Sequence, residues 1–188
     1  MGAFETMIQG DRYWINDPQL IEIRLHTREL VDEFNQLAPR AEAERQHLFT
    51  QLFAEIGDDV HVEKPIHIDY GCNIHLGHHV FINFGWTVLD CAKVTIGDHV
   101  FIGPHVAMYT ANHPLDKTTR ANHIGDAEPI TIGSNVWIGG NCIILPGVTI
   151  GDDCVIGAGS LVTTDIESGM LAMGQPCRAV RPVLEGAR

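Results

Sequence analysis

A six-residue repeat runs through the second half of the chain and restricts the folds that the chain can adopt. An aliphatic residue recurs at every sixth position, and a small or aliphatic residue stands two positions before it. The first set is Ile132, Ile138, Ile144, Ile150, Ile156 and Val162, and the second set is Ile130, Val136, Cys142, Val148, Cys154 and Ser160. The alternation within each unit is typical of a short strand. Glycine often follows the aliphatic residue, and we interpret it as a turn residue because glycine adopts positive φ at low cost.

Strands that alternate with turns, without a returning hairpin, predict a solenoid of parallel strands. Six residues per side and three sides per coil close a triangular prism, with coils stacked about 4.8 Å apart. The repeated aliphatic and small positions then point inward and form the core. The unit recurs at residues 94–108 and, more loosely, at Val62, Ile68, Ile74 and Val80, and the spacing slips near residues 87–93. The alternative, a series of hairpins, would need Asn-Gly or Asp-Gly loops at the strand ends.

The repeat is interrupted once, between Met108 and Ile132. A whole number of six-residue units separates these two residues, but the units between them lack the aliphatic residues. Residues 109–129 are therefore predicted to leave the prism as a loop and return in phase. Loops that interrupt a rigid repeat commonly carry function.

The two ends of the chain differ from the repeat. Residues 17–56 are predicted to form two helices, with Asp17 as N-cap before Pro18 and a second helix from Ala41 to Ile56. We therefore expect an N-terminal helical cap at 1–57, a repeat body at 58–175 and a C-terminal tail at 176–188. The tail contains three arginines, which by themselves indicate only a solvated end.

Composition excludes several functional classes. The 188 residues carry a formal net charge of −12, which disfavours nonspecific binding to nucleic acid. No apolar run approaches the roughly 20 residues that span a bilayer, and the first residues do not resemble a signal peptide. The five cysteines include no CxxC pair, which favours the reducing cytoplasm. Cys72, Cys142 and Cys154 are expected in the core, whereas the roles of Cys91 and Cys177 stay open.

Four segments together resemble one family. Residues 130–166 are similar to the hexapeptide-repeat acyltransferases, and residues 7–35 look like the N-terminal helical cap of the maltose and galactoside O-acetyltransferases. YTANHPLD at 109–116 and GQPCRAVR at 174–181 continue the match. The resemblance covers nearly the whole chain. It implies a mainly β fold, a left-handed parallel β-helix with a helical cap and one extruded loop.

The resemblance also implies transfer of an acetyl group from acetyl-CoA to a hydroxyl of a sugar of maltose, glucose or galactoside type. The reaction needs a base for the hydroxyl proton and groups that hold both substrates. Among 11 histidines, His113 lies in the interruption and matches the family's catalytic histidine, so we expect it to be the general base. Acceptor contacts are expected at Asp17, Asp69, Asn83, Asp90 or a neighbour of it, and Trp137. Coenzyme A contacts are expected at Gly140, Ala158, Thr163, Thr164, Arg178 and Arg181.

Other interpretations remain open. Asp17 is also the expected N-cap, Asn83 could be a turn residue, and Trp137 could simply pack on the surface. The same fold could acetylate an amino sugar or an antibiotic, or could be a noncatalytic scaffold. His75, His78 and His79 raise the alternative of a zinc enzyme, although no metal is expected. The family further implies a homotrimer with sites between subunits.

Overall fold

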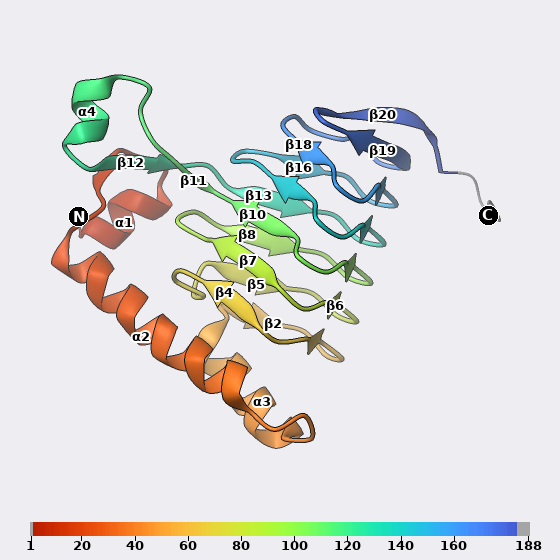
Figure 1. Ribbon diagram of the computed structural model, residues 1–188, viewed down its shortest axis with the longest axis horizontal. Helices are drawn as coiled ribbons and strands as arrows, with labels where there is room; N and C mark the ends of the chain where they lie inside the picture. The colour runs from red at the N-terminus through yellow and green to blue at the C-terminus, as the bar shows by residue number, and fades with distance from the viewer. Residues whose placement is uncertain (1, 184–188) are drawn as a thin grey trace.

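The computed structural model describes residues 2–183, so the last five residues of the predicted tail lie outside the described residues. Figure 1 shows a stack of coils, with two helices across one end and the C-terminal hairpin at the other. Parallel strands from successive coils form the three faces of a prism. The predicted parallel β-helix, with its helical cap and one extruded loop, is confirmed.

Each face of the prism takes one strand from every coil. The first face consists of β2 (Glu55–Ile56), β5 (Ile74–Leu76), β8 (Val94–Ile96), β13 (Ile130–Ile132) and β16 (Thr149–Ile150). The second consists of β3 (His61–Val62), β6 (Phe81–Ile82), β9 (Phe101–Ile102), β14 (Trp137–Ile138), β17 (Val155–Ile156), β19 (Met170–Gly174) and the antiparallel β20 (Cys177–Pro182). The third consists of β4 (Ile66–Ile68), β7 (Trp86–Leu89), β10 (Ala107–Tyr109), β15 (Ile143–Ile144) and β18 (Leu161–Val162).

The core of the prism is built from the two repeated apolar positions. Ile132 stacks on Ile96 below and Ile150 above, in register, and all three side chains are buried. Both sets of predicted inward residues from 130 to 162 are buried. Full burial of one such aliphatic side chain stabilises the fold by about 1.5–3 kcal/mol, so the repeated core accounts for much of the stability.

Glycine is required in the repeat for a different physical reason from the one expected. Gly133 and Gly151 do not have positive φ; positive φ falls two residues later, at Asn135 and Asp153. A Cβ on Gly133 would lie 2.7 Å from the backbone nitrogen of Asp152 in the next coil. The expectation of a positive-φ glycine was therefore wrong for these positions, because close stacking of coils, and not turn geometry, requires the glycine.

The predicted slip in the repeat occurs where the third strand of one coil leads into the first strand of the next. We call this corner of the prism the third edge. Two extra residues lengthen the third edge at residues 89–93, within the predicted region, and again at 69–73, which the sequence did not reveal. Because of the earlier insertion, Leu76 and Ile82, and not Ile74 and Val80, continue the main aliphatic position.

Two helices cover the N-terminal end of the prism. In α2 (Pro18–Gln36), the Asp17 side chain accepts a hydrogen bond from Gln19 N at 2.9 Å, which confirms the predicted N-cap. The next helix, α3 (Glu42–Leu52), ends before the predicted Ile56 because Ala54 N already bonds Ile74 O of the second coil. Apolar residues of both helices join the core cluster of the prism and close its open end.

The predicted loop at 109–129 is confirmed as an excursion from the third edge, and it is ordered. It contains β11 (Ala111–Asn112), α4 (Lys117–Ala121) and β12 (Ile124–Ala127). β12 pairs with β11 and with β1 (Tyr13–Trp14), which follows α1 (Ala3–Ile8). Figure 1 shows α4 and β12 beside α1, away from the C-terminal hairpin. Within residues 2–183, no helix has the length and apolar character needed to cross a membrane.

Candidate active site

His113 lies in the excursion, directly after β11, with an exposed side chain. Its Nδ1 lies 3.2 Å from the carbonyl oxygen of Ile124 at the start of β12. A carbonyl only accepts hydrogen bonds, so Nδ1 carries the proton in the neutral ring and Nε2 keeps its lone pair. The β11–β12 pairing that brings Ile124 to His113 thus selects the tautomer that can act as a base through Nε2.

A cavity of about 650 Å³ opens beside His113. It is lined by Gly10, Arg12, Asn112, His113, Pro114, Leu115, Asp116, Asp126, Ala127 and Glu128. Its walls come from the excursion and from the segment between α1 and β1. Three carboxylates and one guanidinium make this lining polar, which suits a hydroxyl-rich ligand better than an apolar one.

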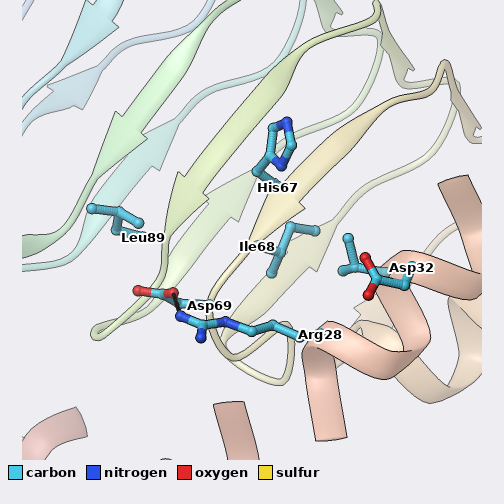
Figure 2. A pocket seen from close by; sticks show the side chains of 7 residues that line it. Arg28, Asp32, His67, Ile68, Asp69 and Leu89 are labelled. Carbon is cyan, nitrogen blue, oxygen red and sulfur yellow. Dashed lines mark ion pairs between the residues drawn. The ribbon is translucent and has the colours of Figure 1, made fainter. Parts of the chain in front are cut away.

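Asp69 lies at the third edge, directly after β4, and faces α2. Figure 2 shows Arg28 reaching from α2 to Asp69, with 3.7 Å between Nη2 and Oδ1. Arg28 and Asp69 line two cavities, one of about 350 Å³ and one of about 280 Å³. Burial raises the pKa of the Asp69 carboxyl, and the nearby arginine charges oppose that rise.

The structure does not support the prediction that Asp90 contacts the acceptor. Its side chain is 0% exposed, so it cannot contact an acceptor from this position, contrary to the expectation. Its Oδ1 accepts a hydrogen bond from Tyr70 N at 2.8 Å, and burial raises the pKa of its carboxyl to about 7. The neighbouring Cys91 is buried as well. Asp90 lies within the two-residue insertion at 89–93, and its hydrogen bonds with Tyr70 N and Asn73 hold it against the edge of the preceding coil.

Three other expected acceptor contacts lie elsewhere. Asp17 is partly exposed and caps α2. Asn83 stands between β6 and β7, at the corner after the second strand, where its side chain accepts a hydrogen bond from Phe84 N. Trp137 projects from the second face with 57% of its surface exposed, beside the equally exposed Phe101 on β9.

The expected coenzyme A contacts fall into two groups. Gly140 and the exposed Ala158 follow β14 and β17, at the same kind of corner as Asn83. Thr164 and Arg178 line one cavity of about 360 Å³ below the C-terminal hairpin, whereas Thr163 and Arg181 are not among its lining residues. The guanidinium of Arg178 donates to the carbonyl of Cys177 at 2.6 Å.

A single chain therefore does not bring all the expected residues into one pocket. His113 and Asp69 belong to the third edge, while Asn83, Gly140 and Ala158 belong to the corner after the second strand. Figure 1 shows the excursion at one side of the prism and the C-terminal hairpin across the C-terminal end of the stack.

Sequence reasoning missed the arginines of α2. Arg24 donates to the hydroxyl of Tyr70 at 2.8 Å, and Arg28 pairs with Asp69. The four-residue spacing of Arg24 and Arg28 places both on one helix face, and this signal could have identified them. Arg12 in the His113 cavity carried no comparable signal.

The histidines that raised the zinc alternative form pairs with carboxylates. Nδ1 of His75 lies 2.9 Å from Glu55, that of His78 lies 3.4 Å from Asp58, and that of His79 lies 3.0 Å from Asp59. In the described part of the chain, no three metal-ligating side chains converge on one point. Among the cysteines, Cys142 and Cys154 are buried as expected, but Cys72, within the insertion at 69–73, is exposed, contrary to the expectation of a core position.

Comparison with known proteins adds independent information. Residues 6–57 match the family model of the maltose acetyltransferase hexapeptide capping motif, and residues 129–164 match six bacterial transferase hexapeptide repeats. The galactoside O-acetyltransferase of Escherichia coli K12 is 45% identical over 164 residues, which cover 87% of this chain and 81% of the relative.

Two solved structures are similar over almost their whole length. A maltose O-acetyltransferase from Clostridium difficile 630 superposes with a TM-score of 0.96 at 43% identity, covering 98% of this chain and 99% of that one. A galactoside acetyltransferase in complex with coenzyme A superposes with a TM-score of 0.94 at 42% identity, covering 98% and 92%.

Proposed function

The chain belongs to the hexapeptide-repeat acetyltransferases that include the galactoside and maltose O-acetyltransferases, and we propose that it acetylates a hydroxyl of a sugar with acetyl-CoA as donor. The observation that carries this proposal is the fixed His113 ring, whose Nδ1 bonds the Ile124 carbonyl. The same ring borders a polar cavity large enough for a monosaccharide. The names of the similar enzymes support a sugar as acceptor.

In this mechanism, Nε2 of His113 removes the proton from an acceptor hydroxyl as its oxygen attacks the thioester carbonyl carbon. The carbon–sulfur bond then breaks, and the imidazolium returns the proton to the departing coenzyme A thiolate. The Ile124 carbonyl stabilises the transient imidazolium through the proton on Nδ1. Asp69 lines the two cavities beside Arg28 and not the His113 cavity, so it would accept hydrogen bonds from the hydroxyls of an acceptor that extends along the third edge.

The residues expected to bind coenzyme A fit such a ligand. Arg178 and Arg181 supply guanidinium groups, which pair with phosphate oxygens. Gly140 has no side chain, and Ala158 is exposed on the neighbouring coil, so an extended pantetheine arm can approach the backbone there. Thr163 and Thr164 add hydroxyl groups at the third edge.

We further propose that the enzyme is a homotrimer with active sites between subunits. The expected residues divide between two corners of the prism, so a neighbouring copy is needed to complete a site that contains all of them. Phe101 and Trp137 form an exposed aromatic surface on the second face, which a second copy could cover. In this arrangement the helices up to α3 cap the prism, the coils from β2 onward form its body, so the body begins a few residues before the expected boundary at 57/58, and the tail contributes the arginines.

The test is release of coenzyme A thiol from acetyl-CoA in the presence of a panel of sugars and amino sugars. We expect release that depends on a neutral sugar, with the acetyl ester identified in the product. Release only with amino sugars would replace the proposed acceptor class. Absence of release with every acceptor, together with absence of coenzyme A binding, would contradict the proposed function.

A further inference from the structure

Buried polar side chains gather at one place in this fold. Among the described residues, five uncharged-polar or acidic side chains are buried: Thr27, Asn73, Asp90, Thr110 and Ser160. The first four lie at the third edge or contact it, and we call them the polar ladder. Burial of polar groups is costly unless each is hydrogen-bonded. Apolar residues fill the neighbouring interior, so packing alone does not explain this concentration.

The lower half of the polar ladder fixes the backbone beside Asp69. The hydroxyl of Thr27, on α2, donates to Tyr70 O at 2.8 Å, and Tyr70 N donates to Oδ1 of Asp90 at 2.8 Å. The amide of Asn73 donates to Asp90 O at 2.6 Å. Both peptide groups of Tyr70, the residue after Asp69, are therefore held by buried side chains. This ties the Asp69 corner to α2 and to the second coil.

The upper half fixes the root of the excursion. Thr110 Oγ1 donates to Leu89 O at 2.7 Å and accepts from Ala92 N at 2.9 Å. The Thr110 carbonyl accepts from Glu128 N at 3.0 Å, which closes the base of the excursion. Thr110 precedes β11, and His113 follows β11 directly. Residues 89–92 are thus hydrogen-bonded to Thr110 in the next coil, through Leu89 and Ala92, and to Tyr70 in the preceding coil, through Asp90.

We propose that Asp90 and Thr110 are positioning residues, which set Asp69 and His113 at a fixed separation across the third edge. This inference rests on the proposed function, because Asp69 is the proposed acceptor contact and His113 the proposed base. Asp90 also keeps Oδ2 buried without a hydrogen-bond partner among the described residues. Such an unfavourable group is typical of a residue retained for a functional geometry.

The test compares disruptive and conservative variants at Asp90 and at Thr110. Asp90→Leu and Thr110→Val remove the oxygen atoms of the ladder, whereas Asp90→Asn and Thr110→Ser keep an acceptor for Tyr70 N and for Ala92 N. For the disruptive variants we expect kcat/KM for the acceptor to fall about tenfold to a hundredfold, the range for misplacement of reacting groups by about 1 Å. The conservative variants should recover to within about threefold, and the KM for acetyl-CoA should change by less than about twofold.

A core variant serves as the control for stability. Val136→Ala removes buried methyl groups at a different corner of the prism and should lower the melting temperature without changing acceptor kinetics. The inference is overturned if Thr110→Val keeps the wild-type kcat/KM for the acceptor. It is also overturned if Val136→Ala lowers this kcat/KM as much as Thr110→Val does. If Asp90→Leu does not fold, Thr110→Val decides the outcome.

A spectroscopic readout separates this inference from the proposed function. In the imidazole nitrogen NMR spectrum, the wild type should show His113 with its proton on Nδ1, and Thr110→Val should show a mixture of tautomers. A changed tautomer in a chain that acetylates no acceptor would contradict the proposed function and leave the positioning role supported. An unchanged tautomer, with unchanged kinetics, would reject the positioning role alone.

Discussion

At the scale of single residues, burial separates two ionisable groups of the third edge. His113 is exposed, and one hydrogen bond to Ile124 O fixes its tautomer. Asp90 is fully buried, and the loss of solvent raises the pKa of its carboxyl to about 7, although Tyr70 N donates to it. The charge on Asp69 raises the pKa of Asp90 further. The charge on Asp90 in turn raises the pKa of the Cys72 and Cys91 thiols.

This raised pKa predicts how stability depends on pH. Between about pH 4 and pH 7, the folded chain keeps the Asp90 proton that the unfolded chain has lost. The Asp90 contribution to the free energy of unfolding therefore falls as pH rises through this window and levels off above it. The slope for one proton is at most about 1.4 kcal/mol per pH unit. Urea unfolding from pH 5 to pH 8 should show a smaller decline for Asp90→Asn than for the wild type; parallel curves would contradict this assignment.

At the scale of elements, the close stacking of coils explains the glycine of the repeat. A Cβ on Gly133 would meet the backbone of the next coil at 2.7–2.9 Å. Similar contacts occur at Gly97, where a Cβ would lie 2.8 Å from the carbonyl carbon of Gly133. The glycine therefore allows neighbouring coils to approach, and the following residues make the turn.

A glycine substitution tests this explanation. Gly133→Ala should lower the free energy of unfolding by about 1–3 kcal/mol, the usual cost of forcing extra atoms into a packed interior. Thr131→Ala, on the exposed side of the same strand, is the matched control and should change stability little. Equal stability of Gly133→Ala and the wild type in thermal and urea unfolding would show that the coils can separate at no cost.

The C-terminal hairpin carries the second prediction at this scale. β19 and β20 hold Arg178 beside the cavity that contains Thr164. Replacing Arg178 and Arg181 together by alanine should raise the KM for acetyl-CoA by about tenfold or more, since each proposed guanidinium–phosphate pair would contribute a charge-assisted hydrogen bond. The KM for the acceptor should stay within about twofold. Equal increases in both KM values would argue against a phosphate-binding role.

Some features of the fold and of the candidate site could be predicted from the sequence, and others could not. Periodicity identified the inward residues because each one recurs in the same environment, and the Asp17–Pro18 pair marked the start of α2. The insertion at 69–73 was concealed because Ile74 and Val80 fit the repeat in the wrong phase. His113 stood out through its interruption and its resemblance. The burial of Asp90 and the Arg28–Asp69 pair depend on stacking between coils, which no local pattern records.

At the scale of the whole molecule, the prism separates the proposed functional groups. The third edge carries Asp69 and His113 at its lower and middle coils, whereas Arg178 of the C-terminal hairpin borders the cavity with Thr164 at the last coil. A rigid stack of coils cannot bend to bring them together. The proposed assembly solves this problem because the third edge of one copy can face the second face of its neighbour.

Mixing of two defective chains tests this arrangement. Trimers assembled from equal amounts of His113→Ala and the double variant Arg178→Ala, Arg181→Ala should contain intact sites at about one quarter of the interfaces, as follows from random cyclic assembly. We therefore expect activity at low acetyl-CoA to recover to about one quarter of the wild-type value after refolding together. Sedimentation should give three times the mass of one chain. No recovery from a mixed trimer would place each site within one subunit.

The most direct test of the central claim is the turnover number of His113→Ala, measured by acceptor-dependent thiol release beside the wild type. Loss of the proposed general base should lower kcat by about 10²- to 10⁴-fold. Because the ring is exposed and makes one side-chain hydrogen bond, the melting temperature and coenzyme A binding should not change. A folded His113→Ala enzyme with wild-type kcat would contradict the account.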